Sequence, residues 1–76
     1  MSRLKVGVLG ASGRMGAEVC RAVEAAEDLE LVASVDIGDP RDALTAADVV
    51  VDFTTPDAVM DNLTWCIEHG LHCVVG

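Results

Sequence analysis

The sequence predicts an α/β fold in which a parallel four-stranded sheet carries helices on both of its faces. Short apolar runs alternate with segments whose apolar residues recur at helical spacing. A glycine-rich segment, VLGASGRMG, ends the first apolar run and opens the first helical segment. Strands that alternate with helices form parallel sheets through right-handed crossovers, and ligands bind at the carboxyl ends of such strands.

The first half of the chain predicts a strand, a helix and a second strand. LKVGVLG over 4–10 is a short apolar run that glycine terminates, as expected of a buried strand. LELVASVD over 29–36 predicts the second strand, and the Gly- and Pro-containing segment 37–48 predicts a loop with at most a short helix starting near Pro40. A helix between the two strands is indicated by apolar residues that share one face, namely Met15, Val19, Ala22, Val23 and Ala26.

The second half predicts a strand, a longer helix and a last strand. DVVVDFT over 48–54 is rich in valine, which is typical of a strand covered on both faces. In the helix that follows, Thr55 is a suitable cap, Pro56 suits the first helical position and Gly70 ends the helix. LHCVVG over 71–76 predicts the fourth strand. We expect the strand order 2-1-3-4, because it brings DFTTP beside the glycine-rich loop.

Composition limits the size, location and partners of the protein. A chain of 76 residues is one small domain or a piece of one. It has no apolar run long enough to span a membrane and no typical signal peptide, which predicts a cytoplasmic protein. The net charge of −8 argues against nucleic acid and anionic membranes as partners. The three cysteines predict reduced, mostly buried thiols.

The glycine-rich segment is the main functional signal. Gly10, Gly13 and Gly16 form G-x-x-G-x-x-G between a strand and a helix, where bare backbone and free N–H groups suit a phosphate. Asp36 ends the second predicted strand 20 residues after Gly16, where a dinucleotide-binding fold places a carboxylate on the ribose hydroxyls. Together they predict a Rossmann-like NADH or NADPH site, whereas glycines that serve only the turn are the alternative.

Charge near the ribose position bears on the choice of cofactor. An Asp there accepts hydrogen bonds from NADH and repels the 2′-phosphate of NADPH, so we expect NADH to bind at least as well. Arg14 has three candidate roles at this stage: a contact to the pyrophosphate, a contact to a 2′-phosphate, or solvent exposure alone. Asp52, at the end of a strand, is expected to brace the following loop rather than to act as a base.

Three motifs carry a resemblance to a known family. VGVLGASGRMG, DFTTPDAVMDNL and EHGLHCVVG resemble, in order, the N-terminal part of the 4-hydroxy-tetrahydrodipicolinate (dihydrodipicolinate) reductase family. The short loop after SVDIGDP is similar to that of compact actinobacterial members. The resemblance implies an oxidoreductase of the diaminopimelate route to lysine, which reduces a cyclic unsaturated dicarboxylate with NADH or NADPH.

The same resemblance implies a set of cofactor-binding positions. They comprise the pyrophosphate loop, the ribose carboxylate, a strand-end pair near the cofactor rings and the first residue of a turn at the nicotinamide: Gly10, Ala11, Ser12, Gly13, Arg14, Met15, Asp36, Phe53, Thr54 and Gly76. Family members carry their catalytic and substrate-binding residues in a second domain. We therefore expect residues 1–76 to be the dinucleotide-binding fragment, with no catalytic residue and no turnover by itself.

Two other functions remain open from the residues alone. One is the cofactor-binding half of an aspartate or homoserine dehydrogenase, and the other is a nucleotide-binding module without enzymatic activity. Continuation of the gene beyond Gly76 would separate them. His69 and His72 flank a helix end and are expected to be structural rather than metal ligands.

Trp65 suggests a contact surface on the second long helix. The apolar residues Val59, Met60, Leu63, Cys66 and Ile67 are expected to share its buried face, with Trp65 projecting from the opposite one. Self-association through the Trp65 face, or through an exposed edge of the sheet, is therefore a further expectation.

Overall fold

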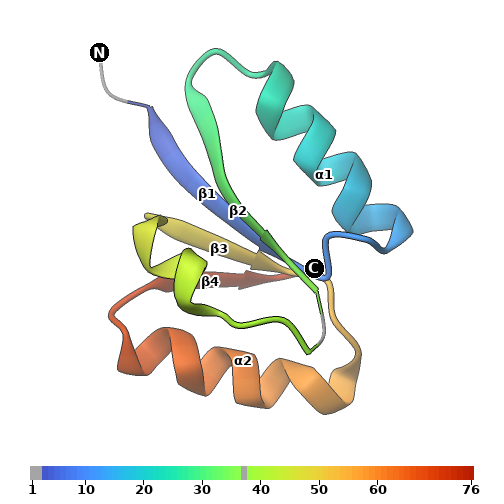
Figure 1. Cartoon of the computed structure of the whole chain (residues 1–76), viewed down its shortest axis with the longest axis vertical. Coiled ribbons are helices and arrows are strands. Elements are labelled where there is room, and N and C mark those ends of the chain that lie inside the picture. The colour runs from blue at the N-terminus through green and yellow to red at the C-terminus, as the bar shows by residue number, and fades with distance from the viewer. Residues whose placement is uncertain (1–2, 37) are drawn as a thin grey trace.

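The computed structural model describes residues 3–36 and 38–76, and its elements alternate as the sequence predicts (Figure 1). In chain order they are β1 (Leu4–Leu9), α1 (Arg14–Ala25), β2 (Leu29–Val35), the 3-10 helix η1 (Asp42–Ala46), β3 (Val49–Asp52), α2 (Pro56–Glu68) and β4 (His72–Val75). The boundaries differ from the predicted ones by a residue or two. The short helix expected near Pro40 is η1, and Ile37, at the start of the predicted loop, lies outside the described residues.

The sheet is parallel and has the order β2-β1-β3-β4, which confirms the predicted topology. In the central strand, Val8 lies opposite Ser34 of β2 and Val51 of β3, and Val51 in turn lies opposite Val74 of β4. All four strands therefore end at the same edge of the sheet. The loops after β1, β2 and β3 meet at that edge (Figure 1).

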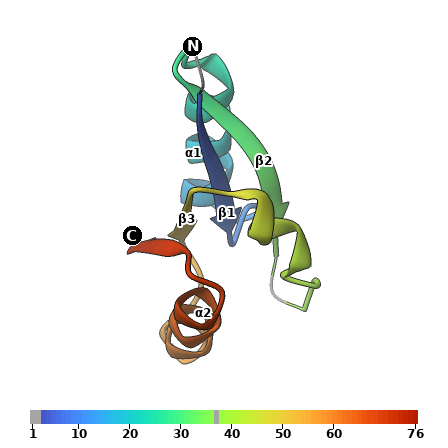
Figure 2. The same cartoon turned by 90° about the vertical axis from the view of Figure 1, so that its left-hand side faces the viewer.

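The two long helices cover opposite faces of the sheet. Figure 2 shows α1 beside β1 and β2, and α2 beside β3 and β4, in agreement with their contacts. Consecutive residues of β1 point to opposite faces: Val8 packs with Val23 of α1, whereas Leu9 belongs to the cluster that contains Leu44 of η1 and Cys66 of α2. No helix among the described residues has both the length and the apolar character needed to cross a bilayer.

Leu44 anchors the loop between β2 and β3 and is completely buried. It reaches the sheet because Gly7 has no side chain; a Cβ on Gly7 would lie 2.6 Å from Leu44 Cδ2. We expect Leu44→Ala to lower the free energy of unfolding by roughly 2–5 kcal/mol through lost burial and a residual cavity. Urea denaturation measures this change. Met60→Ala is the control, because Met60 is 67% exposed and its truncation is expected to cost less than about 0.5 kcal/mol; equal losses in both variants would contradict the anchoring role.

The apolar face predicted for α2 is wrong in part. Met60 and Ile67 are 67% and 75% exposed, while Trp65 is half-buried and packs against the core cluster of Leu9, Leu44 and Cys66. The Trp65 ring also stacks on His69, with centroids 4.1 Å apart. The inward face differs from the prediction because Asn62, a polar residue of α2, is buried, and its amide hydrogen-bonds to Asp52 and Arg41.

Three smaller expectations at helix ends have different outcomes. Met15 is 55% exposed and does not join the core face of α1, where Gly16 and Val23 are buried instead. Thr55 occupies the N-cap position of α2, but its side chain makes no capping hydrogen bond. Gly70 has a φ of +68° just after α2, which confirms it as the residue that ends the helix.

The three cysteines carry free thiols, as predicted. Cys66 is fully buried, while Cys20 and Cys73 are partly buried. Burial, followed by the neighbouring Cys66, raises the pKa of the Cys73 thiol to about 12. Burial also raises the pKa of the Cys20 and Cys66 thiols. All three thiols are therefore protonated at neutral pH and act as small apolar side chains.

Candidate functional site

The loop between β1 and α1 is packed tightly against the end of β3. Gly10 has a φ of +80°, and a Cβ on it would lie 2.9 Å from the backbone carbonyl carbon and oxygen of Phe53. A Cβ on Gly16, in the first turn of α1, would overlap the carbonyl oxygen of Gly10. The two glycines thus hold a bare stretch of backbone at the carboxyl end of the sheet.

The first turn of α1 presents free N–H donors beside this loop. Gly13 is the N-cap and provides no side-chain cap. The first N–H groups of a helix have no partner within it, and those of Arg14, Met15 and Gly16 find no backbone acceptor in the described part of the chain. With the positive end of the helix dipole, they form a site suited to an anion such as a phosphate.

Asp36 lies beside the loop and is joined to it. Its Oδ1 accepts a hydrogen bond from the N–H of Ser12 at 2.8 Å, and its own N–H donates to Asp39 Oδ2 at 3.1 Å. Donation from the backbone of Ser12, and then from the Ser12 side chain, lowers the pKa of the Asp36 carboxyl below its ordinary 3.8. At neutral pH, Asp36 is therefore an ionised group that can only accept hydrogen bonds.

The lowered pKa of Asp36 predicts a pH dependence of stability. An ionised group whose pKa is depressed by folding stabilises the folded state above its unfolded pKa, and this contribution is lost as the pH falls through the folded pKa. We expect Asp36→Asn to lower the melting temperature at pH 7 and the difference from wild type to shrink below about pH 4. Thermal unfolding of both proteins across pH measures this; a difference that grows as the pH falls would contradict it.

The end of β3 is braced by a buried carboxylate. Asp52 is completely buried; its Oδ1 accepts from the N–H of Thr54 at 2.7 Å and from the Thr54 hydroxyl at 2.5 Å. Its Oδ2 accepts from Asn62 Nδ2 at 3.1 Å. This confirms the expected bracing role of Asp52. The same contacts hold Thr54 in place just after the end of β3.

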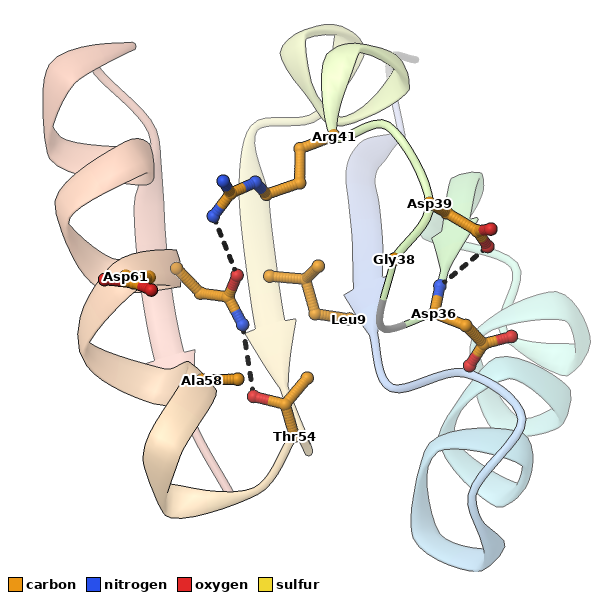
Figure 3. A pocket seen from close by; sticks show the side chains of 9 residues that line it. Leu9, Asp36, Gly38, Asp39, Arg41, Thr54, Ala58 and Asp61 are labelled. Atoms are coloured by element: carbon orange, nitrogen blue, oxygen red, sulfur yellow. Dashed lines mark hydrogen bonds between the residues drawn. The ribbon is translucent and has the colours of Figure 1, made fainter.

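Asn62 is a site residue that the sequence analysis missed. Besides its bond to Asp52, its Nδ2 donates to Thr54 Oγ1 at 3.1 Å, and its Oδ1 accepts from Arg41 Nη1 at 3.0 Å (Figure 3). It is 7% exposed. The signal available in the sequence was its spacing, four residues before Cys66, which places both on one face of α2.

Three cavities with shared lining residues run along the carboxyl ends of the strands. The Asp36 cavity, of about 330 Å³, lies between the loop after β2 and α2 (Figure 3) and is lined by Leu9, Asp36, Gly38, Asp39, Arg41, Thr54, Ala58, Asp61 and Asn62. The loop cavity, of about 280 Å³, is lined by Gly10, Ser12, Gly13, Asp36, Phe53, Thr54 and Thr55. The Gly76 cavity, of about 420 Å³, is lined by Gly13, Arg14, Met15, Gly16, Phe53, Thr54 and Gly76.

These cavities bring the predicted site residues together. Every one except Ala11 lines at least one of them. Ala11 instead packs against the cluster of Val6, Val8 and Val23. Arg14 lines the Gly76 cavity and not the Asp36 cavity, which favours a contact near the loop over one at the ribose.

The described residues hold no group of three or more His, Cys, Asp or Glu side chains placed to bind a metal ion. His69 has a structural environment: it stacks on Trp65, and its Nδ1 lies 2.7 Å from the Trp65 carbonyl oxygen. The three cavities, called the groove below, offer hydrogen bonding and electrostatic attraction from backbone, carboxylate and guanidinium groups.

Comparison with known families shows which protein family the chain belongs to. Residues 4–76 match the family model described as "Dihydrodipicolinate reductase, N-terminus". The chain belongs to this dihydrodipicolinate reductase family. This confirms the resemblance inferred from the three motifs and identifies the chain as the N-terminal part of a member of this family.

Individual dihydrodipicolinate reductases give the extent of the similarity. The chain is 64% identical over 73 residues to the 4-hydroxy-tetrahydrodipicolinate reductase of Cutibacterium acnes, and 70% identical over 73 residues to that of Thermobifida fusca. Each alignment covers 96% of this chain and 30% of the relative. This chain thus spans about 30% of the length of these curated relatives.

A solved dihydrodipicolinate reductase supports the fold independently. The dipicolinate-bound enzyme from Paenisporosarcina sp. TG-14 superposes with a TM-score of 0.82, at 23% sequence identity, over 97% of this chain and 37% of that chain. The four-stranded parallel sheet with two covering helices is therefore the Rossmann-like arrangement of this family.

Proposed function

We propose that this chain is the NAD(P)H-binding domain, residues 1–76, of a 4-hydroxy-tetrahydrodipicolinate reductase of the diaminopimelate route to lysine. The observation that carries the proposal is the pairing of the glycine loop with Asp36, whose Oδ1 lies 2.8 Å from the Ser12 nitrogen. One groove thus presents N–H donors for a pyrophosphate next to an ionised acceptor for ribose hydroxyls. Such a combination suits a dinucleotide.

The residues of the groove fit the parts of the cofactor in order. The gap left by Gly10 and Gly16, which a Cβ would close, suits the close approach of a pyrophosphate to backbone. Asp36 suits the adenosine ribose. Phe53 and Gly76 line the cavity on the other side of the loop and suit the nicotinamide end, which supplies the hydride when bound.

The Asp36 cavity favours NADH over NADPH. Three carboxylates line it, those of Asp36, Asp39 and Asp61, against the single guanidinium of Arg41. A 2′-phosphate would add further negative charge beside Asp36. We therefore propose that NADH binds at least as tightly as NADPH.

Reduction of the dicarboxylate substrate is assigned to the protein as a whole rather than to this groove. Two substrate carboxylates need clustered cationic donors, and of the five Lys and Arg residues only Arg14 and Arg41 line the groove, in different cavities. The structural relative is described with dipicolinate, a cyclic dicarboxylate, bound to it. We propose that residues 1–76 alone bind nucleotide without turning over substrate.

The proposal also includes a cytoplasmic location, without membrane or nucleic-acid partners. The free thiols of the three cysteines and the net charge of −8 support it.

Self-association through the edge of the sheet is a separate part of the proposal. Among the described residues, β4 pairs with β3 alone, and Val74 and Val75 on it are 54% and 47% exposed. An unpaired edge with exposed apolar side chains can pair with a second copy. The Trp65 face no longer supports association, since Trp65 packs on the core. Sedimentation of the purified chain tests this, and a folded monomer at high concentration would contradict it.

Isothermal titration calorimetry of the purified chain with NADH tests the cofactor proposal. We expect saturable binding at a single site, with ADP-ribose competing for it because it carries both the ribose and the pyrophosphate. Absence of binding by a chain that circular dichroism shows to be folded would overturn the proposal.

A further inference from the structure

Arg41 is the one cation in the Asp36 cavity, and its position is fixed. Its Nη1 donates to Asn62 Oδ1 at 3.0 Å, and its Cζ lies 5.7 Å from the centroid of the Trp65 ring. Figure 3 shows Arg41 and Asp36 on either side of Leu9. Asn62 and Trp65 thus hold the guanidinium from α2, on the side of the cavity away from the glycine loop.

No other Lys or Arg of the chain lines the Asp36 cavity. Arg14 lines the Gly76 cavity, and Arg3, Lys5 and Arg21 line none of the three cavities. All five cations lie within the described ranges 3–36 and 38–76. Among the Lys and Arg residues of this chain, Arg41 is therefore the one placed to meet a nucleotide in the Asp36 cavity.

The guanidinium of Arg41 keeps donors for a ligand. Arginine has five N–H donors, and Asn62 is the acceptor that the described residues supply. Three carboxylates, of Asp36, Asp39 and Asp61, line the same cavity. Without Arg41, all the charged side chains of this chain that line the cavity would be negative.

We propose that Arg41 sets how strongly the protein accepts NADPH beside NADH, by pairing its guanidinium with the 2′-phosphate in the Asp36 cavity. The proposal rests on the cofactor-binding function proposed above. A planar guanidinium matches a phosphate with two parallel hydrogen bonds, which makes Arg the residue suited to this contact. Asn62 and Trp65 act as positioning residues, because they hold the guanidinium in place before the nucleotide arrives.

The test is the ratio of the NADPH and NADH dissociation constants in wild type and two charge-matched variants, measured by calorimetry at low salt. Arg41→Gln is expected to weaken NADPH binding about tenfold or more, while NADH changes less than about twofold, as for loss of one charged hydrogen-bonded contact. Arg21→Gln removes the same charge from an exposed position on α1 that lines no cavity, and is expected to leave the ratio unchanged.

Each outcome of this test decides the proposal. An unchanged ratio in Arg41→Gln, or equal weakening of both nucleotides, overturns it while the cofactor-binding function stands. Failure of wild type to bind either nucleotide overturns the cofactor-binding function, and this proposal with it. If Arg41→Gln does not fold, NMR of the wild-type Arg41 side-chain Nε–H decides: adenosine 2′-phosphate is expected to shift it and adenosine is not, and equal shifts overturn the proposal.

Discussion

Gly16→Ala is expected to reduce NADH affinity more than tenfold and to lower the free energy of unfolding by roughly 1–3 kcal/mol. A Cβ at this position would overlap the carbonyl oxygen of Gly10, and only movement of α1 or of the loop relieves the overlap. Such movement displaces the N–H groups of Arg14 and Met15 from the phosphate position. Calorimetry with NADH and urea denaturation measure the two effects.

The sign of the stability change separates packing from helix propensity. At an exposed helical position, glycine-to-alanine substitution stabilises by up to about 1 kcal/mol. Gly13→Ala is the matched control, because a Cβ there lies 3.4 Å from the Gly10 carbonyl oxygen, which is ordinary contact. We expect its free energy of unfolding to stay close to that of wild type. A Gly16→Ala protein that is more stable than wild type and binds NADH normally would contradict the close-packing account.

Asp36→Ala is expected to weaken NADH binding roughly 10- to 100-fold, the range for losing hydrogen bonds to an ionised acceptor. NADPH is expected to lose less, because the repulsion of its 2′-phosphate disappears together with the acceptor. The NADH preference therefore falls, opposite to the change expected for Arg41→Gln. Calorimetry with both nucleotides measures the shift.

Asp61→Asn is the control for this charge change. Asp61 is exposed on α2 and lines the same cavity, so its substitution removes the same charge without removing the contact to the glycine loop. We expect NADH affinity to change less than about twofold in this variant. Intact NADH affinity in Asp36→Ala would remove Asp36 from the ribose position.

Backbone features of the fold were predictable because they depend on local signals. The valine run of β3, Pro56 at the start of α2 and Gly70 after its end each determine one boundary. The strand order followed from placing the loop after β3 beside the glycine loop, and Gly10 packs against Phe53 there. In each case, a short stretch of sequence contains its own physical reason.

Side-chain environments that depend on distant partners were not predictable in this way. Asn62 is buried because Asp52, ten residues earlier, and Arg41, twenty-one residues earlier, both bond to it. Its burial turns α2 so that Trp65 packs inward and Met60 and Ile67 face solvent. A scale of hydrophobicity places the apolar residues inside and has no information on such a polar network.

Some residues of the candidate site could likewise be predicted from the sequence, and others could not. Asp36 and the glycine loop were found from spacing, because both lie at strand ends that the topology brings together. Arg41 was not, because its loop after β2 has no periodicity that indicates where its side chain points. The fully buried Leu44, which holds that loop on the sheet, and the contacts to Asn62 and Trp65 determine its position.

An amide NMR titration of the purified chain with NADH tests the central claim most directly. The account predicts shifts confined to Gly10–Gly16, Asp36, the segment 53–55 and Gly76, which lie in or beside the three cavities. A well-dispersed spectrum in which these resonances stay in place as NADH is added would contradict it.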